Sequence, residues 1–197
     1  MKLITTILLL LTLTLHTKSI DANGNIAQSF KDVRGRITSV LQHNPIVGQT
    51  DIKTSYSYNA VNELLQVKDD KNNLTTAIYD MAGRRTEINN PDSGLLQSIY
   101  DNAGNVITKI TPNLRAESKS ISYEYEYSRL TNINYPNNTH HNVTYTYGDN
   151  PTLYNLGRIT HITDASGERL FEYGKLGETT KDKAEGSGDA NAIHTHW

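Results

Sequence analysis

Hydrophobic and polar residues alternate along much of the chain with a period of two. Residues 121–128 (ISYEYEYS) place Tyr123, Tyr125 and Tyr127 on one face of an extended segment and two glutamates on the other, and residues 143–147 (VTYTY) follow the same pattern. This is the period of a half-buried strand and not of an amphipathic helix. Thr, Val, Ile and Tyr, which suit a pleated surface, are plentiful. The pattern predicts an all-β protein.

A short motif repeats in fixed register along the chain. Residues 78–84 (IYDMAGR) return 21 positions later as residues 99–105 (IYDNAGN), and the same spacing counted backwards reaches Tyr58, where residues 58–63 read YNAVNE. Self-similarity at such a period indicates an array of stacked modules that bury their faces against one another. Each module is expected to be one β-hairpin.

The repeated motif has the chemistry of a tight turn. An aspartate can accept a local backbone N–H, and a glycine can take the positive φ that such turns need, with asparagine as the next most tolerant residue. Looser copies of the motif occur near both ends of the chain. The predicted turn residues are Asn59, Asn62, Asp80, Gly83, Asp101, Gly104, Asp164, Gly167 and Gly177.

These residues resemble the YD repeats of Rhs proteins over roughly residues 20 to 178. The resemblance rests on Tyr79-Asp80 with Gly83, on Tyr100-Asp101 with Gly104, and on residues 171–177 (FEYGKLG). It implies a long β-sheet that spirals into a hollow shell, which bacterial polymorphic toxins and insecticidal toxin complexes use to enclose a toxic C-terminal segment. Related YD shells on animal cell surfaces serve adhesion, and the repeats have been linked to carbohydrate binding. The implied fold is all-β, with stacked antiparallel hairpins forming a twisted, open sheet that is part of a β-spiral shell.

The chain departs from the family pattern at one motif. Family toxins close the shell with an Asp-Pro-x-Gly-Leu segment, whereas here residues 90–95 read NPDSGL in the middle of the array. Pro, Asp and Gly between two strand-like runs are ordinary turn chemistry, so these residues are expected to form a hairpin turn and not a cleavage site. The repeats also look too few to close a shell, which predicts exposed sheet edges and self-association or dependence on a partner.

The two ends of the chain differ in composition from the array. Residues 1–19 begin with Met-Lys, continue as an apolar run and end with small residues, which resembles a secretory signal. Two alternatives stay open for this segment: a buried first strand, or a tail left when a longer gene was cut. Residues 179–197 hold Gly, Ser and several charges with few large apolar residues, so a flexible polar tail is expected there. Export would make this an extracellular or envelope protein, with the membrane contacted only through an uncleaved leader; without export it would be a cytoplasmic fragment.

Charge and composition give little support to ligands other than protein or sugar. The net charge of −2 offers no basic stripe for nucleic acid. There is no cysteine, hence no disulfide or thiolate nucleophile, and no cofactor motif is present. The histidine pairs at residues 140–141 and 194–196 lack a third ligand, so no metal site is predicted.

Catalysis is not predicted either. The carboxylates recur at the same place in each unit, whereas a catalytic pair needs two unlike environments that separate the pKa values of its members. No Gly-x-Ser-x-Gly elbow, His-Glu-x-x-His or phosphate-binding loop occurs in the chain.

The tyrosines admit a second interpretation. A ladder of Tyr123, Tyr125, Tyr127, Tyr135, Tyr145 and Tyr147 offers aromatic faces and hydroxyls that suit sugar rings, which makes Tyr125 and Tyr147 candidate glycan contacts. Cross-strand packing explains the same residues and is the favoured interpretation.

Together the patterns predict a non-enzymatic YD-repeat scaffold segment of an Rhs-like cell-surface or toxin-delivery protein. Its expected partners are further repeats or a protein of the toxin system. Two alternatives stay open: a secreted, carbohydrate-binding adhesin-like module, and a truncated remnant of a larger Rhs gene.

Overall fold

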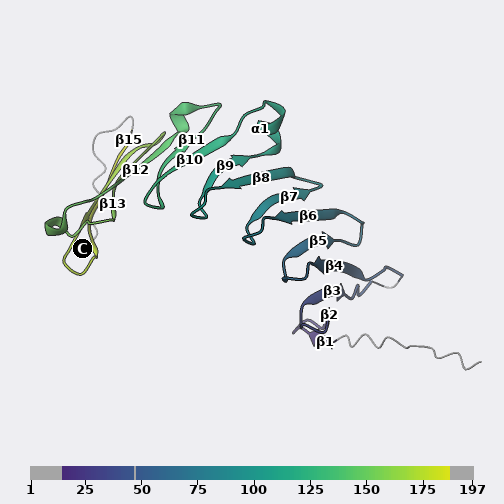
Figure 1. Cartoon of the computed structure of the whole chain (residues 1–197). Coiled ribbons are helices and arrows are strands. Elements are labelled where there is room, and N and C mark those ends of the chain that lie inside the picture. The colour runs from purple at the N-terminus through teal and green to yellow at the C-terminus, as the bar shows by residue number, and fades with distance from the viewer. Residues whose placement is uncertain (1–14, 47, 187–197) are drawn as a thin grey trace, which may run out of the picture. The chain divides into compact units, whose positions relative to one another are not determined.

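The described residues of this protein form mainly antiparallel β-strands. The computed structural model describes residues 15–46 and 48–186. Fifteen strands follow one another in chain order in one sheet, so that strand order and sequence order are identical (Figure 1). The first and the last strand each have one neighbour in this order, so the sheet is open. The all-β prediction is confirmed.

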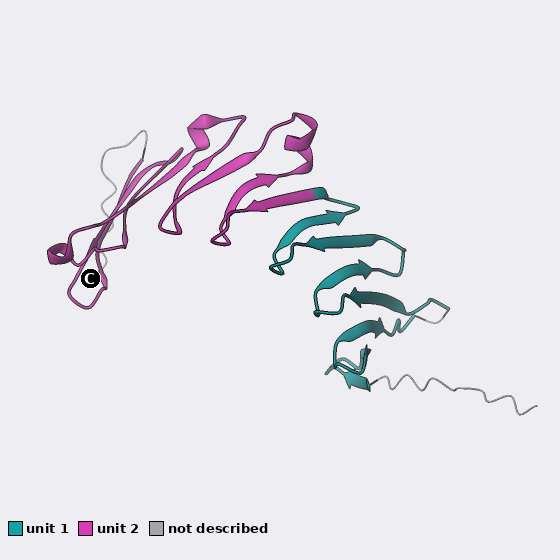
Figure 2. Ribbon diagram, in the orientation of Figure 1, with its two compact units in different colours: residues 1–95 teal, residues 96–197 magenta. Residues whose placement is uncertain are grey.

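The chain divides into two units, residues 1–95 and 96–197 (Figure 2). In the first unit every pair of neighbouring strands is antiparallel. Its strands are β1 (Leu15–Ile20), β2 (Ile26–Lys31), β3 (Ile37–Gln42), β4 (Ile52–Tyr58), β5 (Leu64–Lys68), β6 (Leu74–Tyr79) and β7 (Arg85–Asn90). The turn expected at residues 90–95 is present, since β7 ends at Asn90 and the Oδ1 of Asn90 accepts the backbone N–H of Asp92 at 2.9 Å.

The second unit contains most of β8 (Gly94–Tyr100) and all later elements. Its strands pair in the same antiparallel order. They are β9 (Val106–Ile110), β10 (Ile121–Glu126), β11 (Arg129–Asn134), β12 (Val143–Tyr147), β13 (Ile159–Asp164), β14 (Gly167–Tyr173) and β15 (Thr179–Gly186), with the short helices α1 (Pro112–Ala116), η1 (Thr139–His141) and η2 (Pro151–Leu153) in the connections. No helix among the described residues is long and apolar enough to cross a membrane.

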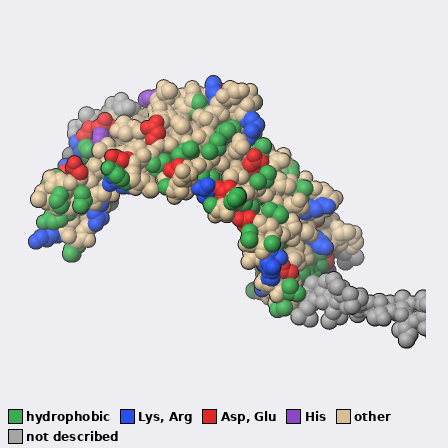
Figure 3. All heavy atoms as spheres, in the orientation of Figure 1, with side chains coloured by type: hydrophobic (Ala, Val, Ile, Leu, Met, Phe, Trp, Pro, Cys, Tyr) green, Lys and Arg blue, Asp and Glu red, His purple; other side chains and the backbone are tan. Residues whose placement is uncertain are grey.

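The sheet has no second layer within either unit. No side chain among residues 15–46 and 48–186 is fully buried. On the face that Figure 3 shows, hydrophobic, acidic and basic side chains are intermixed. What holds the strands in place is therefore the backbone ladder together with side-chain contacts along the sheet.

The two faces of the second unit differ in character. Tyr123 lies directly opposite Ile133, which lies opposite Val143, so one face carries half-buried apolar residues. On the other face Glu124 lies opposite Asn132, whose Nδ2 donates to the Oε2 of Glu124 at 2.9 Å. The alternation read from the sequence thus separates a polar face from an apolar one.

The sheet extends beyond the boundaries expected from composition. Residues 15–19 of the expected leader lie in β1, which pairs with β2 along its whole length. Residues 179–186, expected to be part of a flexible tail, form β15, which pairs with β14. A strand in a single-layer sheet needs backbone partners and not a buried face, and here charged side chains pair across the strands, as Arg169 does with Asp182 and Lys181 with Glu172. Residues 1–14 and the histidines at 194–196 lie outside the described residues.

Tyr127 does not extend the tyrosine ladder. Strand β10 ends at Glu126, and Tyr127 and Ser128 form a two-residue turn in which both have positive φ, 49° and 61°. Tyr127 is 86% exposed. The expectation that Tyr127 shares a face with Tyr123 and Tyr125 is wrong, because the period of two ends where the chain reverses.

Candidate functional site

The repeated motif forms a five-residue turn, and the turn beginning at Asp80 shows its parts. The backbone N–H of Asp80 donates to the carbonyl of Arg84 at 3.0 Å, and the N–H of Gly83 donates to the carbonyl of Asp80 at 3.0 Å. The Oδ1 of Asp80 accepts the N–H groups of Ala82 and Arg84 at 2.9 and 3.0 Å. Gly83 has φ of 76°, which the chain needs in order to re-enter the next strand.

The side chain at the fifth position of the turn completes the motif. In the Asp80 turn the Nε of Arg84 donates to Oδ2 of Asp80 at 2.6 Å. The turn at Asp101 uses an amide instead, since the Nδ2 of Asn105 donates to Oδ2 of Asp101 at 2.8 Å. The same arrangement recurs in the turns that begin at Asp21, Asp32 and Asp69. A donor at the fifth position thus neutralises or solvates the carboxylate at the first.

The turn at Asn59 reverses these roles. Asn59 accepts the N–H groups of Val61 and Glu63 at 3.0 and 2.9 Å, and its own Nδ2 donates to the carboxylate of Glu63. The fourth residue is Asn62, with φ of 73°. The turn needs one acceptor that faces the N–H groups and one complementary partner, and the sequence can place the carboxylate at either end.

In the turn from Gly174 to Glu178 the carboxylate lies on the fifth residue and also accepts a backbone N–H of the turn. Its backbone bonds match those of the Asp turns, with Gly174 N–H to the carbonyl of Glu178 at 2.9 Å and Gly177 N–H to the carbonyl of Gly174 at 2.9 Å. Gly174 has no side chain, and the carboxylate of Glu178 accepts the N–H of Leu176 at 2.9 Å in its place. A Cβ at position 174 would lie 2.1 Å from Oε1 of Glu178, so the carboxylate occupies the space of the missing side chain.

Asp164 and Gly167 belong to a different turn. They lie directly opposite each other across β13 and β14, so the loop between them has two residues. The Oδ1 of Asp164 accepts the N–H of Ser166 at 2.7 Å, and Gly167 has φ of 132°. A Cβ at Gly167 would lie 1.9 Å from the carbonyl oxygen of Glu185, so the close approach of β15 requires glycine here.

Hydrogen bonds within the turns lower the pKa of the turn carboxyl groups. The side-chain amide of Asn105 is the largest cause at Asp101, and the backbone N–H of Arg84 is the largest at Asp80. The pKa is also lowered at Asp21, Asp32, Asp69 and Asp164. Such groups stay ionised and accept hydrogen bonds, and a general acid would need the opposite shift.

Tyrosine hydroxyls connect five of the strands to the hairpin before them. The Oη of Tyr58, at the end of β4, donates to the carbonyl of Ile37 at 2.9 Å, and Tyr79, at the end of β6, donates to Leu64 at 3.0 Å. Each acceptor lies at or next to the beginning of the neighbouring strand. In the second unit Tyr125, Tyr147 and Tyr173 make the same bond to Val106, Leu130 and Ile159 at 2.9, 2.9 and 2.6 Å.

Arginines that follow a turn reach the next turn along the sheet. The Nη1 of Arg36 donates to the carbonyl of Asn59 at 2.9 Å, and its guanidinium lies 5.0 Å from the centre of the Tyr58 ring. Arg158 repeats the arrangement with the carbonyl of Gly177 at 3.1 Å and the ring of Tyr173 at 5.2 Å. Turn, tyrosine and arginine therefore form one structural site that recurs along the sheet.

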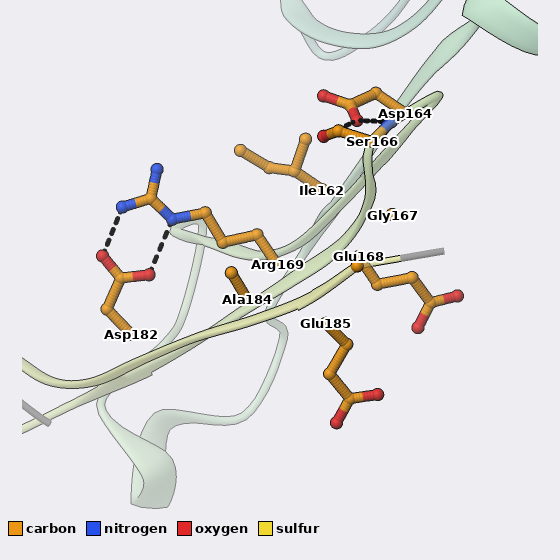
Figure 4. Close-up of a pocket in the computed structure, with 10 residues that line it drawn as sticks. Ile162, Asp164, Ser166, Gly167, Glu168, Arg169, Asp182, Ala184 and Glu185 are labelled. Atoms are coloured by element: carbon orange, nitrogen blue, oxygen red, sulfur yellow. Dashed lines mark hydrogen bonds and ion pairs between the residues drawn. The ribbon is translucent and has the colours of Figure 1, made fainter. Parts of the chain in front are cut away.

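A hollow of about 620 Å³ lies where β13, β14 and β15 meet (Figure 4). Arg169 reaches across it to the carboxylate of Asp182, with its Nε 2.6 Å from Oδ1, and the carboxylate of Asp164 is turned toward Ser166. The side chains of Glu168 and Glu185 point away from that ion pair. The hydroxyl of Ser166 donates to the carboxylate of Asp164, whose Oδ1 also accepts the N–H of Ser166, and no histidine lines the hollow. No group of three metal-ligating side chains lies together in the described part of the chain.

These features define a class of protein: a single-layer array of antiparallel hairpins whose ends are fixed by aromatic-Asp turns. Among solved structures, the chain is similar to the crystal structure of TcdB2-TccC3, with a TM-score of 0.66 and 16% sequence identity over 90% of this chain and 11% of that one. The crystal structure of TcdB2-TccC3-Cdc42 also matches, with a TM-score of 0.46, 15% identity and coverage of 86% and 12%. No family model and no curated protein match the chain.

The comparison shows the fold. The expected likeness to the shell repeats of toxin-complex proteins is confirmed at that level, since 90% of the chain superimposes on a part of TcdB2-TccC3. The chain spans 11% of the length of that protein.

Sequence reasoning missed the hydroxyl bonds and the arginine contacts, although a signal for both was present. A tyrosine comes directly before the turns at Asn59, Asp80 and Asp101. In two of the turns an arginine, Arg36 or Arg84, directly follows the turn glycine. Residues that recur at the edge of a repeat unit, and not only in its turn, are candidates for contacts between units.

Proposed function

We propose that this chain is a non-enzymatic scaffold segment of a longer YD-repeat shell, of the kind that Rhs-like toxin-delivery proteins use. The fold likeness to TcdB2-TccC3 supports this proposal, because the chain corresponds to 11% of the length of that protein. A segment of that relative size would supply one stretch of wall and depend on neighbours for the rest.

One observation carries the proposal: no side chain among residues 15–46 and 48–186 is fully buried. A sheet becomes stable by burying one face against another layer or by closing on itself. This sheet does neither within its units, and its strands are joined by turns and side-chain bonds that repeat. Such a wall gains stability from each further repeat that is added to it.

The proposed partners are further repeats of the same kind, or a protein of the toxin system, next to β1 or β15. Each of these strands has one neighbour among the described residues. An edge strand offers a row of backbone donors and acceptors that another strand can use.

The absence of catalysis is part of the proposal. The turn carboxylates recur in equivalent bonds, and those of Asp80 and Asp101 are already occupied by their own turns. A site that repeats in several hairpins is suited to holding a structure together, and it lacks the unlike pair of carboxyl groups that acid–base chemistry needs.

The alternative of a glycan-binding tyrosine ladder receives less support from the geometry. The hydroxyls of Tyr125 and Tyr147 donate to the carbonyls of Val106 and Leu130, each at 2.9 Å. A tyrosine hydroxyl has one hydrogen to donate, and in these two residues that donor is already used in a bond between hairpins. A glycan array with the chain would test the alternative, since dose-dependent binding lost in Tyr125→Ala and Tyr147→Ala with retained fold would favour it.

Light scattering of the full-length chain tests the scaffold proposal. We expect self-association that increases with protein concentration, together with a circular dichroism spectrum dominated by β-structure. A sharply monodisperse monomer with a cooperative melting transition would contradict the proposal. A chain without β-structure at any concentration would contradict it as well and would favour the truncated gene remnant.

Export of the chain is proposed separately and has its own test. Mass spectrometry of the native N-terminus should show a mature start near Ile20 if the leader is removed. Such a cut would remove nearly all of β1, which runs from Leu15 to Ile20 and pairs with residues 26–31 of β2. An intact Met1 with β1 retained would overturn the proposal of a cleaved leader.

A further inference from the structure

One arginine in the second unit departs from the rule that the other turn arginines follow. Arg36 donates through Nη1 to Asn59 and through Nε to Asp32, at 2.9 and 2.6 Å, while its guanidinium lies against Tyr58. Arg129 takes the same place relative to its tyrosine, with its guanidinium 4.9 Å from the centre of the Tyr147 ring. Its guanidinium makes no hydrogen bond to any of the described residues, and its Nε is shielded from solvent without a partner.

The turn that precedes Arg129 explains why its carboxylate partner is missing. In the five-residue turns the first residue supplies an acceptor, but here the turn has two residues, Tyr127 and Ser128. Neither side chain carries a carboxylate. The guanidinium lies 5.8 Å from the ring centre of Tyr127 instead, so that it is flanked by two tyrosine rings.

The following turn explains why a carbonyl partner is missing too. The Nη1 of Arg129 lies 3.7 Å from the position that a Cβ on Gly157 would take, so it reaches the next loop as Arg36 does. That loop is longer and contains η2. Its backbone groups bond to one another, as in the bonds from Gly157 N–H to the carbonyl of Gly148 and from Arg158 N–H to that of Asn155, both at 2.8 Å.

The backbone at this place is unusual as well. Positive φ at both central residues of a hairpin turn is the role of Asn-Gly or Gly-Gly, and a tyrosine with φ of 49° is strained there. The strained Tyr127 is 86% exposed and lies beside a guanidinium with no hydrogen-bond partner. The neighbouring loop adds the exposed side chains of Leu153 and Leu156, at 58% and 64%.

We propose that Tyr127, Arg129 and Tyr147 form a binding site for a carboxylate side chain of a partner protein. A guanidinium presents several N–H donors in a planar fork that matches the two oxygens of a carboxylate. Two aromatic faces hold the fork in one orientation and limit its hydration, which strengthens a bond to an anion. In the free chain the guanidinium of Arg129 lacks a hydrogen-bond acceptor. The partner would supply the carboxylate that Asp32 supplies to Arg36 and Asp80 supplies to Arg84. The exposed leucines next to it favour an acidic residue within a partly apolar segment.

Fluorescence anisotropy with a labelled, capped hexaglutamate peptide tests this site at physiological ionic strength. Anisotropy remains usable if the chain self-associates. We expect saturable binding to the full-length chain, and at least tenfold weaker binding to Arg129→Gln. The matched control is Arg115→Gln, which removes the same charge in the same unit from an exposed arginine that bonds to Gln97 at 3.4 Å; it should change the affinity less than twofold.

Further arms separate the proposed site from its alternatives. Arg129→Lys keeps the positive charge without the planar guanidinium, and it should bind the hexaglutamate peptide at least threefold more weakly than the unmodified chain. This variant takes the place of Arg129→Gln in the test if Arg129→Gln loses its β-sheet circular dichroism signal. A capped hexaglutamine peptide should not bind. The proposal is overturned if the hexaglutamate does not bind saturably, if Arg115→Gln weakens binding as much as Arg129→Gln, or if inorganic sulfate occupies the site while the peptide does not. Self-association of the chain is not affected by any of these outcomes, so the scaffold proposal is tested independently.

Discussion

The fourth residue of each five-residue turn has positive φ, and Gly104 isolates the effect of that backbone conformation. Gly104 has φ of 93°, and a Cβ at this position would meet nothing within 4 Å. A substitution there therefore costs backbone strain and not a steric clash. We expect Gly104→Val to lower the free energy of unfolding by about 1–2 kcal/mol, because β-branched residues tolerate positive φ poorly.

Gly104→Asn is the control, because Asn62 and Asn72 occupy the same place in their turns with φ of 73° and 69°. This variant should retain most of the stability in a thermal or urea melt. Equal losses for Val and Asn would show that the turn does not depend on the sign of φ.

A tyrosine hydroxyl at the end of a strand contributes to stability through one bond. The Oη of Tyr147 donates to the carbonyl of Leu130 at 2.9 Å in a half-buried setting. Tyr147→Phe keeps the ring and its contact with Arg129, and it should lower the free energy of unfolding by roughly 1 kcal/mol because a partly buried acceptor loses its donor. Tyr127→Phe removes the hydroxyl of a residue that is 86% exposed and should leave the urea midpoint unchanged. The reverse order of effects would contradict the assigned role of the hydroxyl.

At the scale of the element, the first and the fifth residue of a turn act as one unit. The Gly174 turn places its carboxylate on Glu178, whereas the Asp101 turn places it on the first residue and an amide on Asn105. Gly174→Asp alone brings two carboxylates into the space of one, since its Cβ would lie 2.1 Å from Oε1 of Glu178. We expect this variant to lower the melting temperature.

The double variant Gly174→Asp with Glu178→Asn recreates the Asp101 arrangement and should recover most of the loss. The measurement is a double-mutant cycle from urea melts, with an expected coupling of about 1 kcal/mol. Additive effects of the two substitutions would show that the two positions do not exchange roles.

The regular turns could be predicted from the sequence, because their chemistry is local. Asp, Gly and the tyrosine before them lie within a few residues, so the motif at residues 79–84 is enough to place the turn beginning at Asp80. The tight turn at Tyr127 could not be predicted, since neither of its residues favours positive φ. Strand β15 was missed for another reason: its side chains pair with those of β14 across the sheet, and such pairing leaves no apolar pattern along the strand.

The bonds between hairpins show the limit of sequence reasoning for the site. Tyr147 was considered for packing or for glycan contact, but its acceptor is a backbone carbonyl 17 residues away, which has no signature in the sequence. The lone Arg129 is recognisable only once its neighbours are known, because an arginine after a turn has the same appearance in the sequence whether its partner is present or not.

At the scale of the whole molecule, stability is distributed over many equivalent turns and not concentrated in a core. No side chain is fully buried in residues 15–46 and 48–186. Each turn and each tyrosine bond therefore contributes a share of the stability of the sheet. Loss of one turn should affect its neighbours along the sheet more than distant repeats, as in other repeat proteins.

This construction predicts how the molecule responds to acid. The pKa is lowered at the turn aspartates, at Asp101 chiefly by the side-chain amide of Asn105. A carboxyl group whose pKa is lower in the folded chain stabilises it above the unfolded value of about 3.9, and this contribution is lost as the pH falls through the folded value. Because several turns share the property, the melting temperature should be nearly constant between about pH 7 and 5 and fall steeply below about pH 4.

Asp101→Asn separates the turn carboxylates from other acidic groups. The variant lacks the ionised acceptor of its turn, so it should melt below the unmodified chain at neutral pH. The difference between the two should shrink as the pH falls below about 4, because the unmodified chain then loses the same charge. A difference that stays constant down to about pH 2 would show that the Asp101 carboxylate is not the group that links this turn to pH. A melting temperature of the unmodified chain that already falls between about pH 7 and 5 would assign the acid response to groups outside the turns, since none of the lowered pKa values belongs in that range.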